Sequence, residues 1–161
     1  MGRRLAGVLV IAAALVAFSQ VTPTHATDPG NGLGPKTLVG AWFVEVTPTQ
    51  VPPFVSLGIF NSDGTLTNIS SSSLIFPPES PGYGVWSTAG AHKFASTFFT
   101  IVGDGTGKVA ATNKVRAIVT VDPSGDHFSG RFQVDIFDAN GTLIASDTGT
   151  VQARRIKVEP L

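Results

Sequence analysis

The sequence contains no cysteine, and this absence excludes disulfide bonds, thiolate metal ligands and cysteine nucleophiles together. It also lacks an excess of charge of either sign, because eleven Lys and Arg residues balance eleven Asp and Glu residues. A chain with scattered, balanced charge has no electrostatic footprint for nucleic acid or for an anionic membrane surface. The composition therefore predicts no nucleic-acid partner, and no motif predicts a cofactor.

The sequence also lacks the apolar pattern of an amphipathic helix. After residue 36, no window places apolar residues at i, i+3, i+4 and i+7 while also avoiding glycines and β-branched runs. The segments between turns are instead short and rich in Val, Ile, Thr and Phe, which is typical of strands. The sequence therefore predicts an all-β fold.

The first 26 residues have the order of segments that is typical of a secretory signal peptide. Arg3 and Arg4 form a basic start, residues 5–18 are almost all apolar, and residues 24–26 end on a small side chain. The alternative, a membrane anchor, needs about 20 apolar residues, which is more than this run provides. We therefore expect residues 1–26 to be removed and the mature protein to be secreted, with no stable membrane insertion after cleavage.

The rest of the chain divides into a leader and one domain. Residues 27–36 are rich in Gly, Pro and polar side chains and predict a flexible leader. Residues 37–158 form a single domain that is large enough to bury a core without disulfides. Eight strands are predicted within it, at 38–47, 54–60, 65–70, 83–88, 93–102, 108–121, 127–138 and 142–157, the last with a bend or bulge around 147–149.

Nearly all of these strands are joined by turns of hairpin length. Asp63-Gly64, for example, supplies the positive φ angles that a tight hairpin needs. A meander of eight strands has two exposed edges unless its first and last strands pair, and closure leaves an interior for side chains or one small ligand. The alternative, a β-sandwich, needs longer connections than most of these turns. The sequence therefore predicts an eight-stranded antiparallel up-and-down β-barrel.

The alternation of side chains predicts one buried face in most strands. The seventh predicted strand keeps its Arg, Gln and Asp residues on one face and most of its apolar residues on the other. The fifth strand differs, because Phe94 and Phe98 point to one face while Phe99 and Ile101 point to the other. Its outer side is therefore expected to be covered by the N-terminal segment, a loop or a partner subunit, and a homodimer is one interpretation.

The first and last predicted strands carry a recognisable pattern. The first strand opens with Gly40-Ala41-Trp42, and the last strand carries Arg154 and Arg155. This arrangement resembles the calycin superfamily, the lipocalins and their relatives. The resemblance implies that Trp42 packs across the closed end of the barrel, with Arg155 stacked on its ring in a cation–π contact. In strand number and size the chain also resembles barrels similar to allene oxide cyclase, although no catalytic residue can be matched to them.

Candidate chemistry is confined to the barrel interior. His127 lies near Asp122 and Asp126, but turn chemistry already explains these aspartates, so no metal site is predicted. No catalytic motif is found, and catalytic residues are left unassigned. Four aromatic residues and one amide lie at the alternating positions that face the presumed interior, and we predict that they bind the ligand: Trp86, Phe94, Phe98, Asn113 and Phe132.

Asn113 lies on the apolar face of its strand, where an amide needs a hydrogen-bond partner from the protein, water or a ligand. The leading hypothesis is a secreted protein that holds a small apolar molecule in its barrel. Two alternatives stay open: a barrel that templates a cyclisation or isomerisation by positioning alone, and a non-catalytic surface or interaction protein with a filled core. A pair of Tyr83 with an inward carboxylate would favour the enzyme, but no inward Asp or Glu is predicted.

Overall fold

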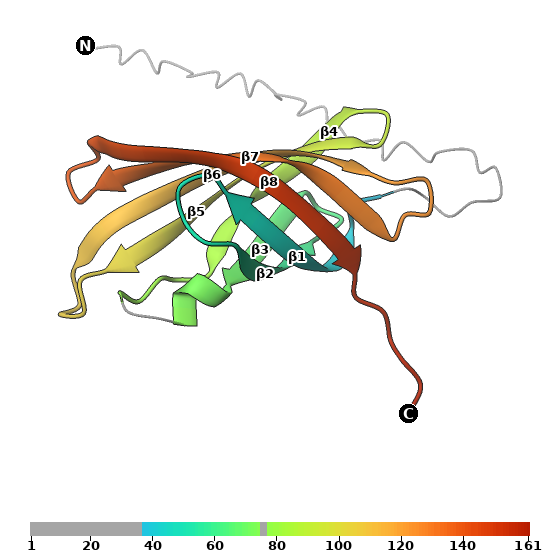
Figure 1. Cartoon of the computed structure of the whole chain (residues 1–161), viewed down its shortest axis with the longest axis horizontal. Coiled ribbons are helices and arrows are strands. Elements are labelled where there is room, and N and C mark those ends of the chain that lie inside the picture. The colour runs from blue at the N-terminus through green and yellow to red at the C-terminus, as the bar shows by residue number, and fades with distance from the viewer. Residues whose placement is uncertain (1–36, 75–76) are drawn as a thin grey trace, which may run out of the picture.

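The computed structural model describes residues 37–74 and 77–161, so the predicted signal peptide (1–26) and leader (27–36) lie outside the described residues. A single 3₁₀ turn, η1 (Ser71–Leu74), separates the third strand from the fourth (Figure 1). The strands are β1 (Gly40–Pro48), β2 (Phe54–Phe60), β3 (Thr65–Ser70), β4 (Gly82–Gly90), β5 (Lys93–Gly103), β6 (Val109–Val121), β7 (His127–Asp138) and β8 (Leu143–Arg155).

The eight strands close into a barrel. Each strand pairs antiparallel with the next one in the sequence, and β1 also pairs with β8. Trp42 opposite Arg155 and Pro48 opposite Gly149 are the two ends of this closing ladder. Closure satisfies the backbone groups of the first and last strands, which would otherwise be open edges. The prediction of an all-β, eight-stranded, antiparallel closed barrel is therefore confirmed.

The wall of the barrel is uneven in height. β2 and β3 have only 7 and 6 residues, whereas β6 and β8 have 13 each. At about 3.3 Å per residue, the longer strands are about 20 Å longer than the shorter ones, and the wall is correspondingly higher on their side. Figure 1 shows the long strands β5 to β8 extending beyond the short ones. The loop at residues 49–53 and the segment that begins with η1 lie on the low side.

The packed core lies at the end of the barrel where β1 begins and β8 ends, which we call the closed end. Leu38, Trp42 and Val121 are fully buried there. The indole of Trp42 meets the ring of Phe128 at 4.8 Å between centroids. We call the opposite end, where β1 ends and β8 begins, the mouth end.

The outer side of β5 remains exposed in the described part of the chain. The exposed fraction of Phe99 is 46% and that of Ile101 is 50%, while Phe94 on the inner side is buried. No loop of residues 37–74 or 77–161 therefore covers the apolar side chains on the outer face of this strand. Cover by the N-terminal segment, which lies outside the described residues, or by a second subunit stays a prediction.

The predicted bulge around residues 147–149 is wrong. The register between β7 and β8 is continuous there, and its one irregularity lies between Ile136 and Phe137. Gly149 has a different role, because it faces Phe132 across the ladder and leaves room for that ring. A Cβ at position 149 would lie 2.6 Å from Cε1 of Phe132. The glycine therefore marks a close side-chain contact rather than an extra residue.

Candidate ligand-binding site

The barrel contains a cavity of about 620 Å³ that extends from the middle of the interior to the mouth end. Pockets of about 300–1,000 Å³ are typical of small-molecule sites. Several inward positions at mid-height carry small side chains, such as Val115 and Ala117 of β6 and Val134 of β7, and all three line the cavity. These short side chains leave open space in the interior.

Most of the cavity wall is apolar. The apolar residues that line it include Val46, Pro48, Val51, Pro52, Pro53, Phe54, Phe98, Val115, Ala117, Val119, Val134, Ile136 and Val151. The loop at residues 49–53 forms the rim between β1 and β2. A molecule in this space would exchange water for apolar contact over most of its surface.

An aromatic floor, made of Trp42, Phe60, Trp86, Phe94 and Phe128, separates the cavity from the closed end. Its rings form a continuous chain, with centroids 6.4 Å apart between Phe60 and Phe128 and 5.7 Å apart between Trp86 and Phe94. Phe60 and Phe128 reach the cavity itself. The indole nitrogen of Trp86 donates to the carbonyl of Asn61 at 3.0 Å, which anchors the floor to the β2–β3 turn.

The structure divides the five predicted ligand-binding residues between wall and floor. Phe98, Asn113 and Phe132 line the cavity. Trp86 and Phe94 also belong to the interior, but they pack in the aromatic floor and are not part of the cavity wall. Parity along a strand identifies the inward side chains, whereas height along the barrel decides which of them border open space.

Asn113 belongs to a polar cluster with Thr100 and Glu79. Its side-chain nitrogen donates to Glu79 Oε1 at 3.0 Å and to Thr100 Oγ1 at 3.1 Å. Thr100, which is buried, donates its hydroxyl to the same Glu79 oxygen. The predicted need of Asn113 for a partner is thus met by protein groups, and the cluster brings a carboxylate to the cavity wall.

The sequence interpretation missed two carboxylates of the cavity lining, Glu79 and Asp147, because it predicted no inward Asp or Glu. Asp147 lies on the inward parity of β8, opposite Val134. Glu79 comes from the connection between η1 and β4, not from a predicted strand. Backbone hydrogen bonds tie this connection to β5: Ser80 N donates to Ile101 O and Gly103 N donates to Pro78 O, both at 2.8 Å. A lone acidic residue within a serine- and proline-rich segment is the signal that could have drawn attention to it.

A second polar pair lines the low side of the barrel. The amide nitrogen of Asn68 donates to Ser56 Oγ at 2.6 Å, and the Ser56 hydroxyl donates to the carbonyl of Ile69 at 3.0 Å. Ser56 is buried, so its hydroxyl is satisfied within the sheet. Asn68 and Ser56 add polar atoms to the wall without adding charge.

The described lining of the cavity contains two residues with ionisable side chains, and both are acidic. Besides Glu79, the lining includes Asp147 of β8, at the mouth end. The hydroxyl of Thr49 donates to the Asp147 carboxylate, as do the backbone N–H groups of Gln50 and Thr148. These hydrogen bonds, first of all the one from Thr49, lower the pKa of Asp147. No Lys, Arg or His is among the described residues that line the cavity.

Arg155 closes the other end of the barrel. Its guanidinium carbon lies 4.3 Å from the ring centre of Trp42. The same group donates to the carbonyls of Gly125, Val39 and Thr37 at 2.6–2.8 Å. Gly40 makes this arrangement possible, because its φ of +130° disfavours other residues and a Cβ there would lie 2.5 Å from Arg155 Nη1.

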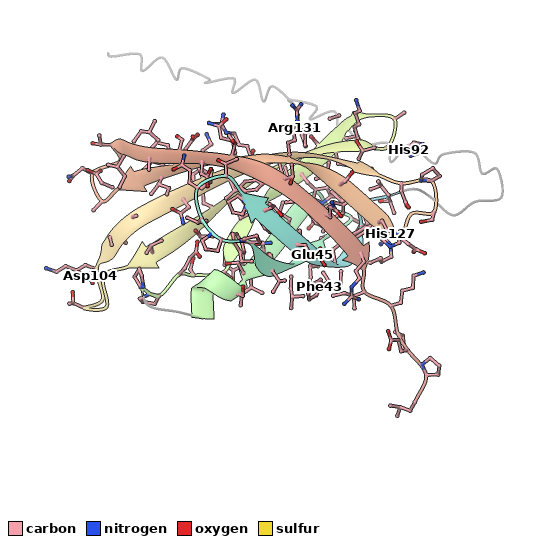
Figure 2. The ribbon with its side chains drawn as sticks, in the orientation of Figure 1. Phe43, Glu45, His92, Asp104, His127 and Arg131 are labelled. Carbon is pink, nitrogen blue, oxygen red and sulfur yellow. The ribbon has the colours of Figure 1, made fainter. Side chains whose placement is uncertain are left out.

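The other titratable residues considered in the sequence lie outside the cavity. Figure 2 shows His92 and His127 at the opposite end of the barrel from Asp104. His127 lies 3.5 Å from Asp122, within a turn. Tyr83, with an exposed fraction of 64%, is on the outer face, so it forms no pair with Glu79 inside the barrel. Within residues 37–74 and 77–161, no three His, Asp or Glu side chains are grouped so as to hold a metal ion.

Comparisons with known proteins do not assign the chain to a family. A scan against protein-family models finds no match, and a search of curated proteins finds none either. The closed eight-stranded barrel is consistent with a calycin-like architecture. In the part of the chain that the structure describes, no helix has the length and apolar character needed to cross a membrane.

Proposed function

We propose that the mature chain is a secreted binding protein that holds a small, mainly apolar molecule inside its barrel. The observation that carries this proposal is the cavity of about 620 Å³, walled chiefly by Val, Phe, Pro and Ala side chains. Its volume suits one small ligand, as expected for an eight-stranded barrel. The basic, apolar and small-residue order of residues 1–26 supports export.

The division of the interior supports binding over a filled core. At the closed end, aromatic rings and Leu38 fill the barrel and close it to solvent. Toward the mouth, the inward positions carry Val115, Val134 and Thr100, and their small side chains leave the interior hollow. A protein with only a structural role would gain stability from larger side chains at these positions, because filling a cavity adds apolar contacts.

A fluorescence titration tests this proposal. N-phenyl-1-naphthylamine, a neutral apolar dye, is expected to bind residues 27–161 with a blue shift and increased emission. Val134→Trp places an indole in the cavity and is expected to reduce the dye's affinity at least about tenfold, since the ligand and the indole compete for the same volume. Thr150→Trp, on the exposed outer face of β8, is the matched control and is expected to bind the dye like the wild type.

Two results would contradict the proposal. One is the absence of any emission change with the wild-type protein at saturating dye. The other is equal dye affinity for the wild type and Val134→Trp, with circular dichroism showing that the variant is folded. The second result would place the dye on the outer surface of the barrel instead of in the cavity.

A further inference from the structure

We infer that the cavity selects apolar molecules that carry a primary ammonium group, and that Glu79 binds this group. This inference rests on the proposed function and specifies the chemical class of its ligand. Three observations carry it: the apolar wall, the position of Glu79 on that wall, and the acidic character of both ionisable residues in the described part of the lining.

Hydrogen bonds from two strands hold the carboxylate of Glu79 in place. The hydroxyl of Thr100 and the amide nitrogen of Asn113 both donate to Oε1, from two neighbouring strands, β5 and β6. The backbone pairing of Glu79 with Val102 fixes the segment from which the side chain comes. A ligand group therefore meets an oriented acceptor, and little side-chain entropy is lost when it binds.

Electrostatics then discriminates between ligand head groups. A carboxylate beside apolar walls is stabilised by a cation, and a charge-assisted hydrogen bond from an ammonium group is stronger than one from a neutral hydroxyl. A fatty-acid carboxylate would enter a cavity whose charged groups are Glu79 and Asp147, with no Lys, Arg or His in the described lining to neutralise it. Like charges in a low-dielectric interior repel strongly, so anionic lipids are disfavoured.

Asp147 extends the same preference to the entrance. Its carboxylate lies at the mouth end and is held by Thr49 and by two backbone N–H groups. Glu79 also comes from a connection at the mouth end, just before β4, so both carboxylates lie toward the entrance of the cavity. The two carboxylates therefore attract a cation along the path into the cavity.

A competition experiment with three ligands of equal chain length tests the inference. Decylamine, decan-1-ol and decanoate displace N-phenyl-1-naphthylamine from residues 27–161 at pH 7.4, and their affinities are compared. We expect decylamine to bind at least about tenfold more tightly than decanoate, with decanol between them. Glu79→Gln keeps an acceptor for Thr100 and Asn113 but removes the charge. In this variant we expect the amine to lose at least about fivefold in affinity and the alcohol to change less than about twofold.

Asp138→Asn is the matched control, because Asp138 ends β7 and is not part of the cavity lining. It is expected to leave all three affinities unchanged. Equal or tighter binding of decanoate overturns the inference, as does an amine affinity that Glu79→Gln leaves unaltered. Dye binding without displacement by decylamine also overturns the inference while leaving the proposed function intact. If neither the dye nor any of the three ligands binds, the proposed function itself fails.

Discussion

At the scale of single residues, Arg155 connects three separate parts of the closed end. It covers the indole of Trp42, and its three donating nitrogens reach the chain before β1 and the turn between β6 and β7. A flat guanidinium can do both, because its face stacks on a ring while its edge donates hydrogen bonds. Lysine has the same charge and three donors, but all three lie on one nitrogen, so it cannot reach the three carbonyls that Nε, Nη1 and Nη2 of Arg155 reach separately.

We therefore predict that Arg155→Lys lowers the free energy of unfolding by about 1–3 kcal/mol, since carbonyls of the closed end lose their donors. Urea denaturation followed by tryptophan fluorescence measures the change. Arg154→Lys is the control, because Arg154 stacks on Phe43 at 4.7 Å outside the barrel and we expect a change below about 1 kcal/mol there. Equal losses in the two variants would contradict the special role of Arg155.

Asp135 illustrates a carboxylate that is held on the outer face of the barrel. Gln133 and Ser146 donate side-chain hydrogen bonds to it, and Arg116 forms an ion pair with it. These contacts, with Gln133 first, lower the pKa of Asp135 from its ordinary value of 3.8. A carboxylate whose pKa is lower in the folded state stabilises the fold above its unfolded pKa, and this contribution is lost as the pH falls through the folded pKa.

We therefore predict that the contribution of Asp135 to the free energy of unfolding is lost in acid. Between pH 7 and about pH 5 the contribution of Asp135 is fully present, and it decreases as the pH falls below about 4. Asp135→Asn is expected to be less stable than the wild type at pH 7, with a difference that shrinks toward pH 3. Urea denaturation across this range measures it, with Glu159→Gln, beyond the last strand, as the control. A difference that is constant with pH would show that charge is not the cause.

At the scale of the elements, four hairpin turns are stabilised by the same arrangement of an aspartate and a glycine. Asp63, Asp104, Asp122 and Asp138 each accept at least one hydrogen bond from a backbone N–H of their own turn, at 2.7–2.9 Å. Each aspartate is followed within three residues by a glycine whose φ is positive. An aspartate that caps the turn backbone and a glycine that tolerates the left-handed region together fix where each strand ends.

This arrangement explains why the strand bounds could be predicted from the sequence. The predicted and observed limits of β2, β3 and β7 are identical, because turn residues frame them on both sides. The inward faces of β6 and β7 were also predicted, since charge lies on one parity. The position of Glu79 could not be predicted, because it depends on where a long connection lies against β5. The height of Trp86 and Phe94 depends on the register between strands, which parity does not specify.

Gly149 supports a prediction about strand packing. A Cβ at this position would lie 2.3 Å from the carbonyl oxygen of Thr47, in addition to its contact with Phe132. Gly149→Ala is therefore expected to lower the free energy of unfolding by about 1–3 kcal/mol, because the backbone of β1 cannot move without breaking the closing ladder. Thr150→Ala, which changes an exposed neighbour, is expected to differ from the wild type by less than about 0.5 kcal/mol. Thermal unfolding of both variants measures the contrast, and equal stability of Gly149→Ala and the wild type would contradict it.

At the scale of the whole molecule, the outer surface of the barrel carries a broad apolar face on β2 to β5. This apolar outer face consists of side chains that are each 41–64% exposed: Val55, Leu57, Ile59, Ile69, Tyr83, Val85, Phe99 and Ile101. Large contiguous apolar patches are uncommon on monomers and often mark interaction sites. β7, in contrast, presents Arg131, Gln133 and Asp135 to the outside.

The flanks of this apolar outer face carry opposite charges. Glu45 lies beside it on β1, paired with Val55, and Lys114 lies beside it on β6, paired with Phe99. In a two-fold dimer whose axis runs parallel to the strands, the same patch meets itself and one flank of each copy lies against the opposite flank of the other. The acidic and basic flanks are complementary in that arrangement. Because β2 to β5 make up half of the barrel, a partner copy would contact mainly the central strands, β3 and β4.

We therefore predict that residues 27–161 form a dimer through this face, which sedimentation velocity at micromolar concentration measures. Tyr83→Lys places a charge at its centre and is expected to give the monomer, because an unpaired ammonium buried in an apolar interface is costly. Gln152→Lys, at an exposed position of β8 outside this apolar face, is the control and is expected to leave the dimer intact. A wild-type protein that sediments as a monomer would contradict the prediction, and binding of that monomer to phosphatidylcholine vesicles would indicate that the apolar outer face meets lipid instead of a second copy.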